Sequence, residues 1–425
     1  MYYYQVDGRP GFSTEKLKEC QEISEHQCRN LMETDQGNIL FFIKKTDVNK
    51  RVSFAITDPA MIFENPDDLE IIRSNQGQRA DTSSIPTWII EKIDQRRVRY
   101  INIAHRSFLN ILNIPQKGKW RVNIVGLGDI GSNLLVGLKL LGGDHISEIG
   151  VYSVKQNVMK RYEMELNQVY SIDEDSPMHT GKPVVKTVEK ENIMDCDMFI
   201  FCASSKVPPV GSETGDVRAV QYDANREILT KYVRKTRDAK FKGIFAIVSD
   251  PVEMLCKAAY EISNTDADGN WDHKGMLPEQ IQGFGLGVMY SRALYYANMD
   301  PDVKDFKRNG RVFGMHGSGL VICDDIHDYN AKKSVELTNK TVNANLMVRE
   351  LGFKPYIAPA LSSGAISIIS RIAGKYNYSS IFIDNAYLGI KNKVSDSGIE
   401  VERIPMNDDL FEKIRNTHDL LKNIK

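Results

Sequence analysis

The stretch VNIVGLGDIGS restricts the fold of this chain more than any other part of the sequence. It places Gly126, Gly128 and Gly131 in a G-x-G-x-x-G spacing between an apolar strand and an apolar helix. In this spacing the first glycine permits a tight turn, the second lets the backbone approach a pyrophosphate, and the third lets the helix pack close to the strand. The pattern predicts a dinucleotide-binding unit, and the alternative is a tight turn of purely structural use.

The start of the helix adds to the binding capacity of this turn. Asp129 and Ile130 occupy its first positions, where free backbone N–H groups and the positive end of the helix dipole favour a phosphate. Both residues are therefore candidate cofactor-binding residues, together with the three glycines.

Strand-like and helix-like stretches alternate after this unit. RVNIVGLG, ISEIGVYSV, KPVVKTV, DMFIFCAS and FKGIFAIVS have the apolar runs of buried strands, and amphipathic stretches of helical length separate most of them. Such alternation implies right-handed crossovers and a parallel sheet with helices on both faces. We expect a Rossmann-type, doubly wound α/β domain over residues 119–287.

The flanking segments predict two further domains. Residues 1–118 have the mixed pattern of a small α+β domain, in which GNILFFIKK and KRVSFAITD are strands, NPDDLEIIRSN is a short helix and QRRVRYINIA is a half-buried strand. The stretch NIPQKGKW then reads as a linker, because proline and glycine interrupt it. We expect residues 288–425 to form an α+β catalytic domain that binds the substrate.

Composition excludes several classes of function. A formal net charge of -1 argues against a dedicated nucleic-acid binder, and the sequence has no apolar run long enough to cross a bilayer. The six cysteines are scattered without C-x-x-C pairs, which favours reduced thiols over a disulfide framework or a zinc site. The start MYYYQVDGRP lacks the order of a secretory signal. We expect a cytoplasmic protein with no metal site and no membrane partner.

The end of the second strand leaves the cofactor open between NAD and NADP. An acidic residue is expected there to bind the ribose hydroxyls of NAD, but the chain has Ser153. A serine carries no charge that would repel a 2′-phosphate, and Lys155 and Arg161 would supply positive charge for one. The alternative is that Ser153 binds a ribose hydroxyl and Lys155 is merely solvated.

Three further residues are candidates for the chemistry. His316, in RVFGMHGSGL, has the side chain whose pKa suits proton transfer near neutral pH. Arg218 and Arg292 have planar guanidinium groups that bind carboxylates in a two-pronged manner. Taken singly, each also has a plain structural interpretation: His316 as a turn residue, Arg218 as an ion-pair partner at a helix start, and Arg292 as a surface arginine.

The order of motifs resembles the lactate/malate dehydrogenase family. The resemblance rests on the glycine loop, GDVRAVQYDAN, IVSDPVEML, GFGLGVMYSR and GMHG, and on the closing stretch from AYLGIKNKV, all in the family's order. It covers about residues 119–425 and leaves the first 118 residues outside.

The resemblance implies a role for each candidate. His316 would be the acid/base, Arg292 the carboxylate clamp, Arg218 the arginine that polarises the carbonyl, and Asn225 a cofactor-binding residue. The implied reaction is hydride transfer between a nicotinamide cofactor and a 2-hydroxy or 2-oxo acid or a related hydroxy compound. The implied partners are a small-molecule carboxylate substrate and further copies of the chain in a homo-oligomer.

The sequence departs from the family pattern at the residues around His316. Met289 stands where the family has the aspartate that holds the histidine, and Asp250 stands where the family has an asparagine. The loop SSKVPPVGSETGDVR is longer than is usual, and Lys354 or Pro355 occupies a pocket position that the family varies. A methionine cannot accept the histidine's hydrogen bond, so Asp250 is the candidate to orient His316 from another side.

These departures leave two alternatives to a dehydrogenase. One is a catalytically weak or inactive relative that binds a dinucleotide and acts in regulation or partner binding. The other is an enzyme of the same fold that carries out a different proton transfer with Asp250 as the base.

Overall fold

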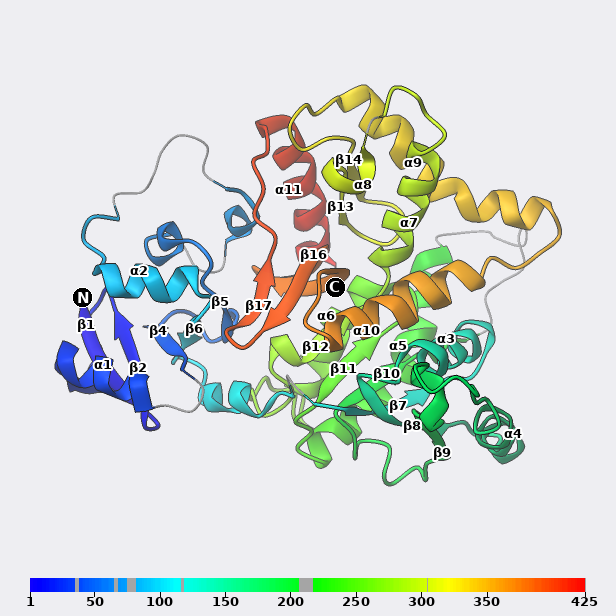
Figure 1. Cartoon of the computed structure of the whole chain (residues 1–425), viewed down its shortest axis with the longest axis horizontal. Helices are drawn as coiled ribbons and strands as arrows, with labels where there is room; N and C mark the ends of the chain where they lie inside the picture. Colours follow the sequence, from blue (N-terminus) through cyan, green and yellow to red (C-terminus); the bar gives the residue numbers. More distant parts are fainter. Residues whose placement is uncertain are drawn as a thin grey trace.

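Two β-sheets organise the molecule (Figure 1). The structure is a computed structural model that describes residues 1–34, 38–64, 68–74, 82–115, 118–205, 217–303 and 305–424, without the side chains of 177 and 217–220. A six-stranded sheet belongs to the N-terminal part, and an eleven-stranded sheet runs through the rest of the chain. No helix in the described ranges is long and apolar enough to cross a membrane.

The predicted Rossmann domain is confirmed by the order of its strands. Six parallel strands follow the order β9-β8-β7-β10-β11-β12. Successive strands are added to one side of β7 up to β9 and then, from β10, to its other side, so the strand order reverses between β7 and β10. The apolar strand stretches are almost wholly buried because helices cover the sheet. The elements are β7 (Trp120–Val125), α3 (Asp129–Leu141), β8 (Ile146–Tyr152), α4 (Gln156–Leu166), β9 (Val184–Thr187), β10 (Met198–Phe201), α5 (Val217–Asp238), β11 (Ile244–Ile247), α6 (Val252–Ser263) and β12 (Ile281–Gly283).

The same sheet continues into the C-terminal part through antiparallel strands. β15 pairs with β12, and β16, β13, β14 and β17 extend the sheet beyond it. The expected boundary at residues 287 and 288 falls within α7, so a helix rather than a linker crosses it. The elements are α7 (Leu286–Ala297), α8 (Phe306–Asn309), β13 (Arg311–Gly314), β14 (Leu320–Cys323), α9 (Ala331–Glu350), a π-helix (Pro359–Ile366), α10 (Ser367–Ile372), β15 (Asn377–Ile383), β16 (Ala386–Ser395), β17 (Gly398–Val401) and α11 (Asp408–Asn423).

The N-terminal sheet has the strand order β3-β1-β2-β4-β6-β5. Its elements are β1 (Tyr2–Val6), β2 (Arg9–Ser13), β3 (Gln21–Ile23), α1 (Glu25–Thr34), β4 (Leu40–Lys44), β5 (Ser53–Ala55), α2 (Thr87–Asp94) and β6 (Val98–Asn102), with 3₁₀ helices at Pro59–Ile62, Leu69–Ile72 and Phe108–Asn113. The helix expected in NPDDLEIIRSN is thus a single 3₁₀ turn, and residues 65–67 and 75 of that stretch lie outside the described residues.

The strand predicted in QRRVRYINIA is confirmed as β6, but the prediction that it is half-buried is wrong. All five residues of β6 are buried, including Arg99 at 4% exposure. The reason is tertiary, because β6 lies between β4 and β5 inside the sheet.

The N-terminal sheet and the C-terminal segment share one hydrophobic core. Phe42, Ile89 and Tyr100 from the N-terminal part pack in the same cluster as Phe313 of β13 and Ile414 of α11. Figure 1 shows β17 between the N-terminal sheet and the parallel strands, with α11 above it. The first 118 residues therefore have their own sheet but not a separate core.

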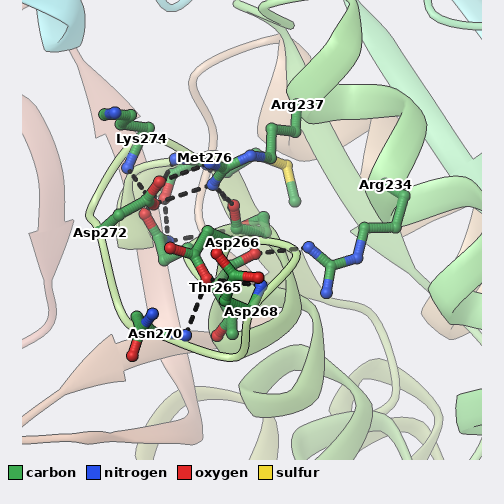
Figure 2. A network of polar contacts seen from close by, with 12 residues as sticks. Arg234, Arg237, Thr265, Asp266, Asp268, Asn270, Asp272, Lys274 and Met276 are labelled. Carbon is green, nitrogen blue, oxygen red and sulfur yellow. Dashed lines mark hydrogen bonds and ion pairs between the residues drawn. The ribbon is translucent and has the colours of Figure 1, made fainter.

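A polar loop after α6 is tied to the end of α5 (Figure 2). The Arg237 guanidinium binds the Asp272 carboxylate through Nη1 and Nη2, and it lowers the pKa of that carboxyl group. Asp266 accepts hydrogen bonds from the backbone N–H groups of Asp268 and Asn270. The acidic side chains of this loop thus order the chain that leads into β12.

A buried carboxylate joins the two sheets. Glu279 lies just before β12, and its Oε1 accepts hydrogen bonds from the backbone N–H groups of Val52 at 2.7 Å and Ser53 at 2.9 Å. Its Oε2 is buried and has no hydrogen-bond partner among the described residues. Burial raises the pKa of Glu279 to about 7, although these backbone N–H groups and Arg51 oppose the rise.

We predict that Glu279 makes the stability of the protein depend on pH. A carboxyl group whose pKa rises on folding stabilises the protein below its unfolded pKa, and this contribution disappears as pH increases through about 7. Glu279→Gln is neutral at every pH. Its free energy of unfolding, relative to that of the wild type, should therefore increase by on the order of 2 kcal/mol from pH 5.5 to pH 8.5. Denaturant unfolding at both pH values measures this difference. An equal offset between the two proteins at both pH values would contradict the prediction.

Candidate functional site

The candidate site is a cavity of about 1210 Å³ at the carboxyl ends of the parallel strands. The loops after β7, β10, β11 and β12 line it, which places it at the point where the strand order reverses. This is the position at which open α/β sheets bind their ligands. The candidates Gly128, Asp129, Ile130, Asp250, Arg292 and His316 all line this one cavity.

The glycine loop has the form that a bound pyrophosphate requires. Gly126 has a φ of +91°, and a Cβ on it would lie 2.3 Å from the backbone nitrogen of Ala203. A Cβ on Gly131 would lie 1.9 Å from the carbonyl oxygen of Gly126, so the helix packs directly on the turn. A Cβ on Gly128 would meet no atom within 4 Å, which leaves open space beside the helix N-terminus. The residues therefore fit a dinucleotide.

His316 lies in the turn between β13 and β14. Gly317 follows it with a φ of +108°, a backbone conformation that favours glycine. Thr417 of α11 donates a hydrogen bond to the carbonyl oxygen of Gly319 at 3.1 Å and holds the turn from behind. The turn directs the imidazole toward the cavity, where its side chain is 19% exposed.

Asp250 contacts the imidazole of His316. Its Oδ1 lies 2.7 Å from Nδ1 of His316, which is hydrogen-bond distance. Burial lowers the pKa of His316, but the charge and hydrogen bond of Asp250 outweigh this effect and the pKa is raised overall. The carboxylate expected at position 289 is therefore supplied from the end of β11.

A second carboxylate holds the backbone of the same turn. Glu253 of α6 accepts a hydrogen bond from the backbone N–H of His316 at 3.4 Å and from the hydroxyl of Ser380 at 2.8 Å. It is buried, and burial raises its pKa while Ser380 and His316 oppose the rise. Glu253 was not among the predicted site residues, although it is the last residue of the family-like S-D-P-V-E stretch.

Arg292 reaches the cavity from the middle of α7. Its Nη1 lies 4.0 Å from the sulfur of Met289, a weak contact. Burial lowers its pKa, and the nearby charge of Asp250 opposes this change. A half-buried guanidinium in this position can bind a carboxylate.

Asn225 makes two hydrogen bonds within the protein. Its Nδ2 donates to the carbonyl oxygen of Asp250 at 2.7 Å, and its Oδ1 accepts from the backbone N–H of Ser205 at 2.8 Å. It thereby joins the ends of β10 and β11 beneath the cavity. The backbone of Arg218 lies in α5, but its side chain and the preceding residues 206–216 lie outside the described residues.

The expected ribose-binding residues lie at the end of β8, outside the lining of this cavity. Ser153 is half-buried, and its hydroxyl accepts a hydrogen bond from the backbone N–H of Lys155 at 3.3 Å. The side chain of Lys155 is exposed, whereas Arg161 is paired with Glu165 at 2.8 Å. Lys155 is thus the better placed of the two cations for a phosphate.

One wall of the cavity, formed by α9 and residues 352–356, was not predicted from the sequence. One face of α9 lines it through Val342, Asn345, Leu346 and Arg349, which recur at helical spacing. Residues 352–356 continue the wall. No local sequence signal marks this face, because a helix end with mixed polar and apolar residues is ordinary.

Metal-binding residues do not gather in the described part of the chain. No group of three His, Cys, Asp or Glu side chains is arranged there to hold a metal ion. All six cysteines are free thiols, of which five are buried.

Comparison with known proteins identifies relatives of this chain. Residues 120–271 match the family model of the lactate/malate dehydrogenase NAD-binding domain. The L-lactate dehydrogenase of Staphylococcus epidermidis is 20% identical over 339 residues, which are 72% of this chain and 98% of that protein. That of Macrococcus caseolyticus is 24% identical, over 72% of this chain and 96% of that protein.

Solved structures show the same fold. The minor L-lactate dehydrogenase of Enterococcus mundtii aligns with a TM-score of 0.56 and 18% identity, over 72% of this chain and 97% of that chain. A lactate dehydrogenase from a Medee basin deep-sea metagenome library aligns with the same TM-score, 16% identity, and 72% and 98% coverage. The resemblance inferred from the motifs is confirmed, and it spans less than three quarters of the chain.

We predict that replacing Gly128 by alanine weakens cofactor binding, whereas replacing Gly131 by alanine lowers stability. Gly128→Ala should fold normally but bind NADH at least about tenfold more weakly, because the methyl group enters open space beside the helix N-terminus. Gly131→Ala should lose roughly 1–3 kcal/mol of stability through its clash with Gly126. Thermal melts and NADH titrations separate the two effects. Wild-type NADH affinity in Gly128→Ala would contradict the cofactor assignment.

Proposed function

We propose that this chain, whose residues 120–271 match the NAD-binding domain of lactate/malate dehydrogenases, is an oxidoreductase that interconverts a 2-hydroxy acid, or a related hydroxy compound, and its 2-oxo form. The substrate is a small molecule, in our proposal a carboxylate. The homo-oligomer expected from the family stays a prediction.

The observation that carries the proposal is the contact between His316 and Asp250 in the cavity. The two side chains are 2.7 Å apart, and Arg292 and the glycine loop line the same space. A proton-transfer group, a carboxylate-binding cation and a dinucleotide cradle are the three parts that this reaction requires.

His316 moves the proton in this mechanism. With Nδ1 bound to Asp250, the other ring nitrogen, Nε2, is the one available to the substrate oxygen. The protonated imidazole donates to the 2-oxo oxygen during reduction, and the neutral imidazole accepts the hydroxyl proton during oxidation. Asp250 fixes the orientation of the ring and stabilises the imidazolium.

The arginines bind and polarise the substrate. Arg292 clamps the carboxylate through paired N–H groups, which also compensates for the burial of its own charge. We assign Arg218 the role of polarising the carbonyl, on the strength of the family motif alone. Asn225 acts indirectly, by holding the backbone of Asp250 in place.

The backbone of the loop Gly126, Gly128, Asp129, Ile130 and Gly131 would hold the cofactor pyrophosphate through its N–H groups, and Ser153 and Lys155 would lie at its ribose. The nicotinamide ring, when bound, supplies or accepts the hydride. The family model favours NAD, while the serine at position 153 permits NADP as well.

A specific observation supports a second candidate function. Met289 removes the family's usual carboxylate, so a catalytically weak relative that binds a dinucleotide in a regulatory role is the alternative. Dinucleotide binding without turnover of any 2-oxo acid would favour it. Turnover that depends on Asp250 but not on His316 would instead favour Asp250 as the base of another proton transfer.

We predict that a carboxylate at position 289 can partly replace Asp250 as the partner of His316. Asp250→Asn should lower kcat for reduction on the order of 10²-fold, because His316 loses its carboxylate. It should also shift the fall of kcat/KM with rising pH to lower pH, since Asp250 raises the pKa of His316. Adding Met289→Asp, which recreates the family arrangement, should restore part of kcat.

Rates across pH with a panel of 2-oxo acids measure these effects. Met289→Leu, which keeps the size of the side chain without a carboxylate, is the control for the rescue. Full kcat and an unshifted pH profile in Asp250→Asn would remove Asp250 from the mechanism.

We predict that Ser153 sets the choice between the two cofactors. Ser153→Asp should raise the ratio of NADH to NADPH affinity at least about tenfold, because the carboxylate binds ribose hydroxyls and repels a 2′-phosphate. Titration of both cofactors into wild type and variant measures the ratio, with Ser153→Asn as the uncharged control. An unchanged ratio would show that Ser153 does not face the ribose.

A further inference from the structure

An ion pair joins two residues that line the cavity. Nζ of Lys354 lies 3.0 Å from Oδ2 of Asp129, and both residues line the cavity. Asp129 belongs to the first turn of α3, and Lys354 belongs to the wall formed by residues 352–356. The contact therefore joins the dinucleotide-binding half of the molecule to the substrate-binding half.

This ion pair contributes little to stability. The side chains of Lys354 and Asp129 are 79% and 54% exposed, and exposed pairs of this kind contribute only about 0–1 kcal/mol. A role in ligand binding has to be considered, because the pair lies at the glycine loop.

Asp129 is an unfavourable residue for a loop that binds phosphates. Its carboxylate lies in the first turn of α3, beside the open space at Gly128. An anion at this helix N-terminus is stabilised by the same N–H groups and dipole that would otherwise attract a pyrophosphate. The carboxylate also repels the two negative charges of that group. Binding a dinucleotide here requires a compensating cation.

Lys354 is the cation that the structure brings to this point. Its ammonium group lies 3.0 Å from the carboxylate of Asp129, which belongs to the first turn of the helix whose N-terminus attracts phosphate. A flexible side chain with a compact charge is suited to phosphate oxygens, which it binds as a point charge.

We propose that Lys354 is a cofactor-binding residue whose ammonium group binds the pyrophosphate of the dinucleotide and neutralises Asp129. The inference rests on the proposed function only in taking the ligand to be a dinucleotide. It assigns to the substrate-binding half a direct contact with the cofactor.

The test is calorimetric titration of NADH and of ADP-ribose, which has the pyrophosphate but no nicotinamide. Lys354→Met should weaken both ligands about fivefold to tenfold and reduce the salt dependence of their affinity. Asp129→Asn should bind both more tightly than the wild type, and Lys354→Arg should bind like it. Lys231→Met, which breaks an exposed lysine pair with Glu227 on α5, is the control for a change of net charge.

Unchanged affinity for ADP-ribose in Lys354→Met, with a folded protein by thermal melt, would overturn the proposal. So would a higher KM for the 2-oxo acid with unchanged NADH affinity, since Lys354 would then belong to the substrate site. Neither titration needs turnover. Wild-type protein that binds ADP-ribose but transfers no hydride contradicts the proposed function alone.

Discussion

The contact between Asp250 and His316 is the interaction on which the rest of the site depends. It joins the end of β11 to the turn between β13 and β14, two elements 66 residues apart in the chain. Each partner is held by neighbours: Asn225 binds the backbone of Asp250, and Glu253 binds the backbone of His316. A histidine in a turn gains a defined orientation and a raised pKa from this arrangement, and without them it would be an ordinary polar residue.

The fold outside the cavity serves to keep these two elements in register. One sheet runs from the parallel dinucleotide-binding strands into the antiparallel strands that carry His316. The N-terminal sheet reinforces it, because Phe313 of β13 and Val321 of β14 pack in the core that this sheet shares with α11. The N-terminal part thus packs against the strands that flank the histidine turn, although none of its described residues lines the cavity.

The sequence predicted those features that local patterns determine. The glycine spacing, the apolar strands and the amphipathic helices follow from neighbouring residues, so the parallel sheet was predicted correctly. Positions 250 and 289, compared with the family pattern, predicted that Asp250 replaces the missing carboxylate. The 2.7 Å distance between Asp250 Oδ1 and His316 Nδ1 supports this prediction. The α9 wall and the Lys354–Asp129 pair could not be predicted, because they depend on which distant segments meet. Glu253 stands in a family-like stretch that could have marked it, but its contacts with His316 and Ser380 depend on distant segments too. The burial of β6 was missed for the same reason.

Transfer of deuterium from the cofactor to the substrate tests the central claim most directly. The protein would be incubated with NADH dideuterated at C4 of the nicotinamide and with a panel of 2-oxo acids, and the products would be analysed by mass spectrometry. We predict a 2-hydroxy acid that carries one deuterium at C2. Binding of NADH without deuterium in any product would contradict the assignment of this chain as a dehydrogenase.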